Sequence, residues 1–198
     1  PELVPGPGEP LVHKHHHSSF EGTDLEALLA GIGGHNGIRL FHDQLIDKAP
    51  GAPSVGWHTD RSYWLTCSST EMLTAWVPLV DVDEESGALQ VVPGSHRGSL
   101  ADRDPASMEV LALPVHLAPG DAVVFDASLV HAAGANVSDG PRRALHILFA
   151  RPWVQPHWDL PASIPHAIAE GLDDEQRRLL GFASRPRRFD HDARRVVR

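Results

Sequence analysis

The chain has 198 residues, of which 41% are hydrophobic and 22% charged, and this balance excludes a disordered or fibrous protein. The formal net charge of -9 argues against nucleic acid as a partner, and no apolar run approaches the ~20 residues of a membrane span. A single cysteine allows no internal disulfide, so we expect one cytoplasmic domain over residues 1–198.

The N-terminal part predicts one helix. Residues 1–20 carry Pro and Gly without hydrophobic periodicity, so we expect them to be irregular. Thr23 with Glu26 three residues later is a capping-box pattern, and the Gly-Gly pair at 33–34 supplies a stop, so a helix is expected between them. The histidine run "HKHHH" before it has no spaced carboxylate, and we interpret it as a surface loop.

The centre, about residues 38–152, predicts several short strands separated by turn signals. Apolar and polar residues alternate over 38–46, and a second strand or its edge is expected at "WHTDRSYW". An apolar run over 72–82 and a short strand in "ALQVVPGSHRGS" follow, while 101–113 has the composition of a loop. Residues 115–153 predict further strands, so the whole centre is typical of a β-sandwich or barrel.

The last part of the chain changes character. The stretch "LDDEQRRLLGF" predicts a short helix that ends at Gly181. Residues 185–198 hold six arginines, which favours a solvated basic tail. We therefore expect residues 153–198 to form a helical and basic extension of the β core.

A possible metal site begins in the stretch "GWHTDRSYW". His58 and Asp60 are two residues apart, and side chains at this spacing in a strand point to one face. The pair alone is equally compatible with the polar face of an ordinary strand. His131, which follows an apolar strand, offers a third ligand, although a surface histidine is the simpler interpretation of that residue taken by itself. Two histidines and one carboxylate are the set that holds non-haem Fe(II) and leaves three coordination positions open.

Arg142 is a candidate partner for a carboxylate group of a bound molecule. Arg142 lies eleven residues beyond His131, at the start of "RRALHILFA". A guanidinium there suits a bidentate grip on a distal carboxylate, although pairing with a surface carboxylate is its ordinary use.

Longer pieces of the chain resemble a known family in their order and spacing. These pieces are "QLIDKAPG", "WHTD", "TAWVPLVDVDEESGALQVVPGSHRGS" and "PGDAVVFDASLVHAAGANVSDGPRRAL". Over roughly residues 25–153 they resemble the phytanoyl-CoA dioxygenase family of Fe(II)- and 2-oxoglutarate-dependent oxygenases. The resemblance implies a mainly β fold with flanking helices, built on a double-stranded β-helix, which is a jelly-roll barrel of the cupin type. It also implies Fe(II), 2-oxoglutarate as cosubstrate and O2.

The resemblance assigns roles residue by residue. It makes His58, Asp60 and His131 the iron ligands. It makes Arg142 the partner of the far carboxylate of 2-oxoglutarate, with the neighbouring Arg143 as the competitor for that role.

Three further pocket positions follow from the same resemblance. Gln44 falls where the family places a cosubstrate contact, Trp76 where a side chain lines the same pocket, and Trp64 near the cosubstrate or substrate. Ala133 stands where the family often has a hydroxyl residue, so that hydrogen bond is expected to be missing.

Other polar residues of these pieces receive simpler interpretations. Lys48 belongs to a turn and is interpreted as structural or as a support for the site. His42 and His146 are expected to line the barrel or the surface. Asn136 is expected to shape a turn together with Ser138, and the pair at 96–97 is placed as a candidate for the substrate mouth.

The implied reaction is hydroxylation, or a related C–H oxidation, of a small or medium-sized metabolite with release of succinate and CO2. The alternative is a cupin-like metal-binding protein without oxygenase activity, which would keep the three ligands and lose the grip on 2-oxoglutarate. Arg142 and Gln44 argue against that alternative. A binding module in which His58 and Asp60 are ordinary strand residues would require many coincident matches.

Overall fold

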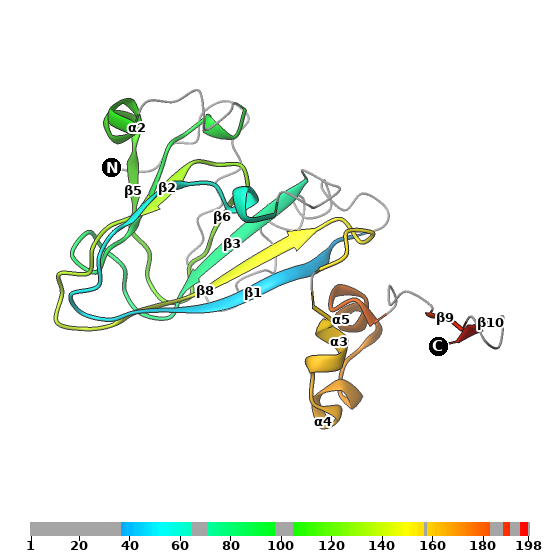
Figure 1. Ribbon diagram of the computed structural model, residues 1–198. Coiled ribbons are helices and arrows are strands. Elements are labelled where there is room, and N and C mark those ends of the chain that lie inside the picture. The colour runs from blue at the N-terminus through cyan, green and yellow to red at the C-terminus, as the bar shows by residue number, and fades with distance from the viewer. Residues whose placement is uncertain are drawn as a thin grey trace.

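Two four-stranded antiparallel sheets form the body of the protein (Figure 1). The computed structural model describes residues 37–64, 71–97, 105–156, 158–182, 188–190 and 195–197. The first sheet has the order β1-β8-β3-β6, with the strands Arg39–Lys48, Arg142–Ala150, Met72–Pro78 and Val123–Asp126. The second has the order β2-β7-β4-β5, with the strands Val55–His58, His131–Ala133, Leu89–Val91 and Leu113–Val115.

Short helices surround these sheets. They are α2 (Pro105–Leu111), α3 (Leu160–Ser163), α4 (His166–Glu170), α5 (Asp174–Leu179) and the 3-10 helices η2 (Asp60–Trp64) and η3 (Ser95–Arg97). A separate pair, β9 (Arg188–Asp190) with β10 (Arg195–Val197), forms a short antiparallel ladder. The predicted mainly β fold with flanking helices, a double-stranded β-helix, is confirmed. None of the helices within the described ranges is long and apolar enough to cross a membrane.

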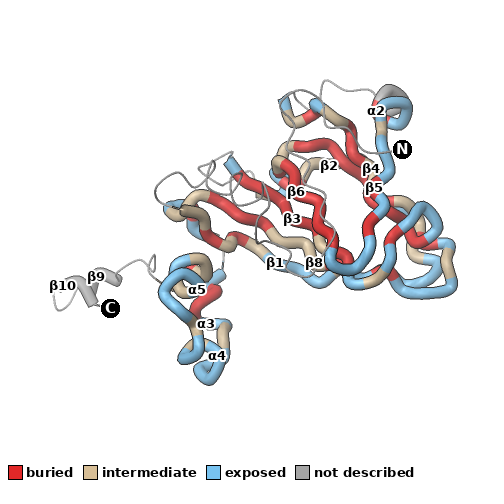
Figure 2. The backbone as a smooth tube through the Cα atoms, turned by 180° about the vertical axis from the view of Figure 1, so that it is seen from behind, coloured by how far each residue is buried: buried red, intermediate tan, exposed pale blue. Residues whose placement is uncertain are grey.

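Alternation along the strands of the first sheet separates an inner face from an outer one. Along β3, Leu73 and Ala75 belong to the outer cluster, whereas Trp76 belongs to the cluster between the sheets. Leu179 of α5 packs against the outer cluster, so the C-terminal extension covers part of the outer face. Figure 2 shows the buried residues concentrated on the strands, while α4 and α5 contain no buried residue. Helix α3 buries Leu160 and Pro161.

The core between the sheets is apolar and draws on both of them. Trp76 and Phe125 come from the first sheet, and Leu89 and Val91 from the second. Each of these four side chains is at least 94% buried. Trp76, Leu89 and Phe125 also line a cavity, to which polar residues such as Asp60 and Arg142 contribute.

Some of the sequence predictions were wrong in detail. The strand or strand edge expected at "WHTDRSYW" is present only as the end of β2, which stops at His58, and the chain turns into η2 at Asp60. The segment 101–113 was expected to be a loop, but it contains α2 and the start of β5. Helix α2 has seven residues and buries Met108 while Val110 stays 85% exposed, so it is too short to show a helical period.

Other predictions are confirmed. The helix expected in "LDDEQRRLLGF" is α5, which begins with a capping box between Asp173 and Gln176. Gly181 follows it with a φ of 83°, a left-handed conformation that glycine adopts without strain. The helix predicted between 23 and 34, the irregular segment 1–20 and the histidine run lie outside the described residues.

Candidate metal centre and cosubstrate pocket

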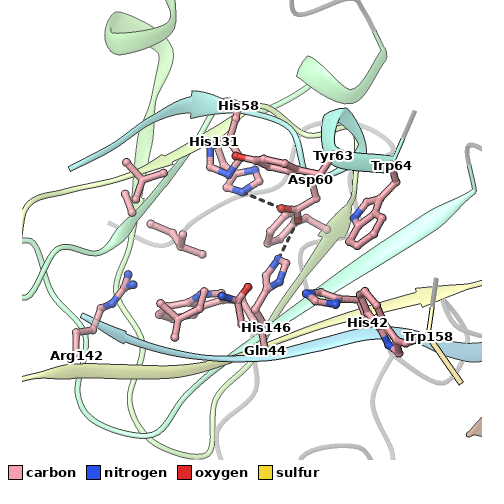
Figure 3. A pocket seen from close by; sticks show the side chains of 16 residues that line it. His42, Gln44, His58, Asp60, Tyr63, Trp64, His131, Arg142, His146 and Trp158 are labelled. Atoms are coloured by element: carbon pink, nitrogen blue, oxygen red, sulfur yellow. Dashed lines mark hydrogen bonds and ion pairs between the residues drawn. The ribbon is translucent and has the colours of Figure 1, made fainter. Parts of the chain in front are cut away.

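The three predicted metal ligands lie together at one end of the barrel (Figure 3). His58, at the end of β2, pairs in register with His131 at the start of β7, and their ring centroids are 4.3 Å apart. Asp60 is the first residue of η2, which turns its carboxylate back toward both rings. One ligand atom from each residue lies within 4.8 Å of the others. The 3-10 turn, rather than a continuous strand face, therefore assembles the set.

Backbone carbonyls fix the tautomers of the two histidines. The Nδ1 of His58 lies 2.8 Å from the carbonyl of Gly56, and the Nδ1 of His131 lies 3.0 Å from the carbonyl of Leu129. Because a carbonyl oxygen only accepts, each Nδ1 must carry the proton and donate it. Each Nε2 then presents a lone pair, which is the form of histidine that binds a metal ion.

Asp60 completes the donor set as a buried carboxylate. Its side chain is 6% exposed, and its Oδ1 lies 3.5 Å from the Nε2 of His131. Two lone pairs that face each other across this distance repel unless a cation lies between them. The donors present therefore fit a divalent metal ion, and two histidines with one carboxylate suit Fe(II).

The other carboxylate oxygen of Asp60 is held by two neighbours. Thr74 Oγ1 donates to Oδ2 at 2.5 Å, and the Nε2 of His146 lies 3.2 Å from the same atom. Burial alone would raise the pKa of Asp60, but His146, His131 and Thr74 together lower this pKa to about 2. Asp60 is therefore ionised near neutral pH. Burial also lowers the pKa of His131, which favours its neutral form.

Arg142 lies at the far end of the same cavity, away from the metal ligands (Figure 3). Its guanidinium lies over the ring of Trp76 at 5.2 Å, and its Nη1 donates to the carbonyl of Gly87 at 2.9 Å. Its Nε is buried and has no hydrogen-bond partner in the described part of the chain. Arg143 is exposed and pairs instead with Asp47 at 3.2 Å. The structure thus brings Arg142, and not Arg143, into the cavity.

A second cation lies beside Arg142. Lys48 is opposite Arg142 in the β1–β8 register, is 6% exposed, and its Nζ has no hydrogen-bond partner among the described residues. Burial and the charge of Arg142 both lower the pKa of Lys48. Two buried cations with unsatisfied donors form a place for an anionic group.

The cavity between the metal ligands and Arg142 has a volume of about 420 Å³. Its lining residues are His42, Gln44, Ile46, Val55, His58, Asp60, Tyr63, Trp64, Trp76, Leu89, Phe125, His131, Ala133, Arg142, His146 and Trp158. All seven residues predicted as ligands or pocket positions are among them. His96 and Arg97, the candidates for the substrate mouth, are not.

Sequence reasoning missed three features of this site. The contact of His146 with Asp60 was not predicted, although His146 is two positions along β8 from Ala144 and four from Arg142, on the same strand face. Tyr63 follows Asp60 within the unpredicted 3-10 helix. Trp158 comes from the C-terminal extension, and no pattern in the sequence indicated that it returns to the barrel.

The turn after His131 is built as expected. Asn136 is fully buried, and its amide group donates to the carbonyls of Lys48 at 2.9 Å and Gly140 at 2.8 Å. Its Oδ1 accepts from the hydroxyl of Ser138 at 2.7 Å. These bonds tie the loop between β7 and β8 to the end of β1, and so position Arg142 beside Lys48.

The fold and the site define a double-stranded β-helix protein in which two histidines and one carboxylate form a candidate metal site. The chain belongs to the phytanoyl-CoA dioxygenase (PhyH) family, whose sequence model matches residues 11–144. The family resemblance seen in the sequence is therefore confirmed.

Curated proteins that are similar to this chain bear the name dioxygenase. The chain is 28% identical over 189 residues to "Dioxygenase FrzG" of Cladobotryum sp, a match that covers 85% of this chain and 60% of the relative. It is 32% identical over 144 residues to "Dioxygenase olcK" of Penicillium canescens, and this match covers 70% of this chain and 47% of the relative. The chain therefore spans about half to three fifths of the length of these relatives.

Solved structures agree in fold. The non-heme alpha ketoglutarate dependent carbocyclase SnoK from nogalamycin biosynthesis is 27% identical, with a TM-score of 0.53 over 64% of this chain and 56% of that one. EvdO2 from Micromonospora carbonacea var. aurantiaca, solved in complex with 2-oxoglutarate, is 28% identical. The match has a TM-score of 0.51 and covers 63% of this chain and 57% of EvdO2.

Proposed function

We propose that this chain forms the catalytic barrel of an Fe(II)- and 2-oxoglutarate-dependent dioxygenase. Its reaction is hydroxylation, or a related C–H oxidation, of a small or medium-sized metabolite. The observation that carries the proposal is the presence, in one cavity, of the ligands His58, Asp60 and His131 and of the buried Arg142. We also infer a cytoplasmic location from the single cysteine of the sequence.

The metal ligands support this proposal through their protonation states. His58 and His131 each direct a lone pair toward the carboxylate of Asp60, and hydrogen bonds keep that carboxylate ionised. Three protein donors leave the remaining positions of an octahedral ion open for small molecules.

The far end of the cavity supports a dicarboxylate cosubstrate. Arg142 lines the cavity and offers a buried, unsatisfied Nε to a distal carboxylate, while Trp76 holds the guanidinium plane in position. Lys48 is paired with Arg142 in the β1–β8 register and adds a second buried, unsatisfied donor behind the lining residues. Gln44 lies on the same face of β1 as Lys48, which suits it to a polar contact with the bound molecule. Ala133 lines the cavity without a hydroxyl group, so Arg142 and Lys48 carry the recognition that a hydroxyl residue supplies elsewhere.

When bound, iron(II) with 2-oxoglutarate and O2 supplies an oxidative decarboxylation to succinate and CO2 that is coupled to oxidation of a C–H bond. The contribution of the chain is to position the bound molecules and to exclude water from the cavity. Leu89 and Phe125 form apolar walls of the cavity, and the aromatic side chains near its mouth limit the access of water. The alternative of a metal protein without oxygenase activity leaves the buried donors of Arg142 and Lys48 unexplained.

The proposal predicts that Fe(II), 2-oxoglutarate and O2 produce succinate slowly even without substrate. Purified protein should form succinate in an Fe(II)-dependent manner, and His131→Ala should abolish the reaction. His116→Ala is the matched control, because His116 is a 55% exposed histidine that pairs with Glu84 outside the cavity. Succinate formation that persists in His131→Ala would disprove the proposed function.

A further inference from the structure

We propose that the end of the cavity away from Arg142 binds an uncharged, ring-containing substrate that carries a hydroxyl group. This inference rests on the proposed function, since it concerns the substrate of the same site. The subsite consists of the aromatic cluster, defined as His42, Trp64 and Trp158, together with His146. Figure 3 shows the His42 ring between the ring of His146 and that of Trp158, with Trp64 beside them and Arg142 at the opposite end.

The three rings of the aromatic cluster are in mutual contact. The ring centroid of His42 lies 5.3 Å from that of Trp64 and 4.9 Å from that of Trp158, and the two tryptophans are 5.8 Å apart. Phe41, which is fully buried, supports Trp64 with an edge-on contact at 5.1 Å. Aromatic walls of this kind bind flat ring systems through large apolar contact areas. Trp158 is 38% exposed, so the cluster reaches the surface.

Among the described residues that line the cavity, no formally charged side chain at this end is left to pair with a charged substrate. Among the described lining residues, the formally charged side chains are Asp60 and Arg142. Asp60 is engaged by Thr74 and His146, and Arg142 lies at the opposite end. Burial, followed by the effect of His146, lowers the pKa of His42, which therefore stays neutral near pH 7. A charged group placed here would lose hydration without gaining a partner, which is costly.

Two histidine nitrogens make the subsite selective for a hydroxyl group. Asp60 is an acceptor, so the Nε2 of His146 donates to it, and the Nδ1 of His146 is the ring nitrogen left for another partner. This Nδ1 and the Nδ1 of His42 are both buried without a hydrogen-bond partner in the described part of the chain. Buried polar atoms are almost always satisfied in a working protein. A hydroxyl group both donates and accepts, so it suits either nitrogen.

Trp158 comes from beyond the segment that the family model matches. The family match ends at residue 144, and Trp158 lies fourteen residues later. Helix α3 begins directly after it, where Asp159 caps the helix by accepting from the backbone N–H of Ala162 at 3.1 Å. The capped helix fixes the position of Trp158 against His42. The C-terminal extension thus supplies one wall of the substrate site.

The test is a ligand-observed NMR titration with three probes of one skeleton. These are 2-naphthol, naphthalene and 2-naphthoate, which carry a hydroxyl group, no polar group and a carboxylate. The full chain is saturated anaerobically with Fe(II) and 2-oxoglutarate, so that Arg142 is occupied. We expect 2-naphthol to bind about tenfold more tightly than naphthalene, and 2-naphthoate to bind most weakly.

Variants separate the two parts of the subsite. Trp158→Ala should weaken 2-naphthol binding about tenfold, and because Trp158 is partly exposed this variant should keep its fold. His42→Phe keeps a ring and loses the nitrogens, so it should weaken 2-naphthol and leave naphthalene unchanged. Trp153→Ala is the matched control, since Trp153 is 55% exposed, contacts Arg151 and does not line the cavity.

Each alternative outcome overturns the inference. Binding of 2-naphthoate as tight as that of 2-naphthol would show that a charge is accepted. Unchanged binding in Trp158→Ala would show that the aromatic cluster is not the site. Repeating the 2-naphthol and naphthalene titrations on metal-free protein distinguishes this failure from a failure of the proposed function. If the expected preference for 2-naphthol persists there while no succinate forms, the subsite stands and the oxygenase assignment falls.

Discussion

The Nε2 of His146 lies 3.2 Å from the Oδ2 of Asp60, although the two residues are 86 positions apart in the chain. Together with Thr74, His146 occupies the carboxylate oxygen that faces away from His131. The remaining oxygen, Oδ1, is thereby directed toward the two histidine ligands. We therefore propose that His146 positions Asp60, one of the proposed metal ligands.

We predict that His146→Leu weakens metal binding by roughly 10–100-fold, the usual effect of losing a group that orients a ligand. His146→Gln keeps a side-chain N–H donor and should restore part of the affinity. Competition against a metal-binding dye measures both variants. Wild-type affinity in His146→Leu would show that the contact does not orient Asp60.

Arg142→Leu should weaken 2-oxoglutarate binding on the order of 100-fold, because it leaves a buried carboxylate without its charged partner. Metal affinity should stay unchanged, since the metal ligands are at the other end of the cavity. Arg143→Leu is the control, because Arg143 is exposed and pairs with Asp47. A larger loss in Arg143→Leu than in Arg142→Leu would reverse the assignment. Calorimetric titration with 2-oxoglutarate measures its affinity for the metal-loaded wild type and for both variants.

The low pKa of Asp60 predicts a pH dependence of stability in the metal-free chain. Burial raises this pKa, but the hydrogen bonds and the histidines lower it from 3.8 to about 2 on folding. The folded state therefore holds the proton less tightly than the unfolded one. The resulting stability, on the order of 2 kcal/mol, is present above about pH 4 and is lost as the pH falls toward 2. Denaturant unfolding at several pH values should show a shallower decline in Asp60→Asn than in wild type, with the exposed Asp43→Asn as control.

Asn136→Ala should lower the free energy of unfolding by about 2–4 kcal/mol, because it removes the buried donor to the carbonyl of Lys48 together with the bonds of the side chain to Gly140 and Ser138. Ser138→Ala removes one hydroxyl from the same turn and should cost about 1 kcal/mol or less. Urea unfolding gives both values. Equal effects of the two substitutions would show that the buried bonds of Asn136 do not stabilise the turn.

Strand β1 was predictable because its side chains alternate between two environments, whereas β3 was predicted from a continuous apolar run. In β1, His42, Gln44 and Ile46 line the cavity, and residues such as Asp43 are exposed. Period-two alternation is a local property, so the sequence reports it directly. The same holds for α5, where Asp173 and Gln176 form a local capping box.

Other features depend on contacts between distant segments, and these the sequence did not reveal. The turn at Asp60 is held by a backbone bond from Arg61 to Ala127 and by Thr74, both remote in the chain. Trp158 reaches the cavity because the C-terminal extension folds back over the barrel. Arg142 was preferred to Arg143 from the sequence alone, and the pleat of β8 gives the physical reason, because it buries Arg142 and exposes Arg143.

The most direct test of the central claim is an anaerobic titration of the metal-free protein with Fe(II) and then 2-oxoglutarate, followed by visible absorption. The account predicts a weak metal-to-ligand charge-transfer band that appears after 2-oxoglutarate is added. The band should need far more 2-oxoglutarate in Arg142→Leu and should be absent in His131→Ala. If wild-type protein binds Fe(II) but shows no band at saturating 2-oxoglutarate, the cavity does not hold the cosubstrate on the metal, and the proposed function is wrong.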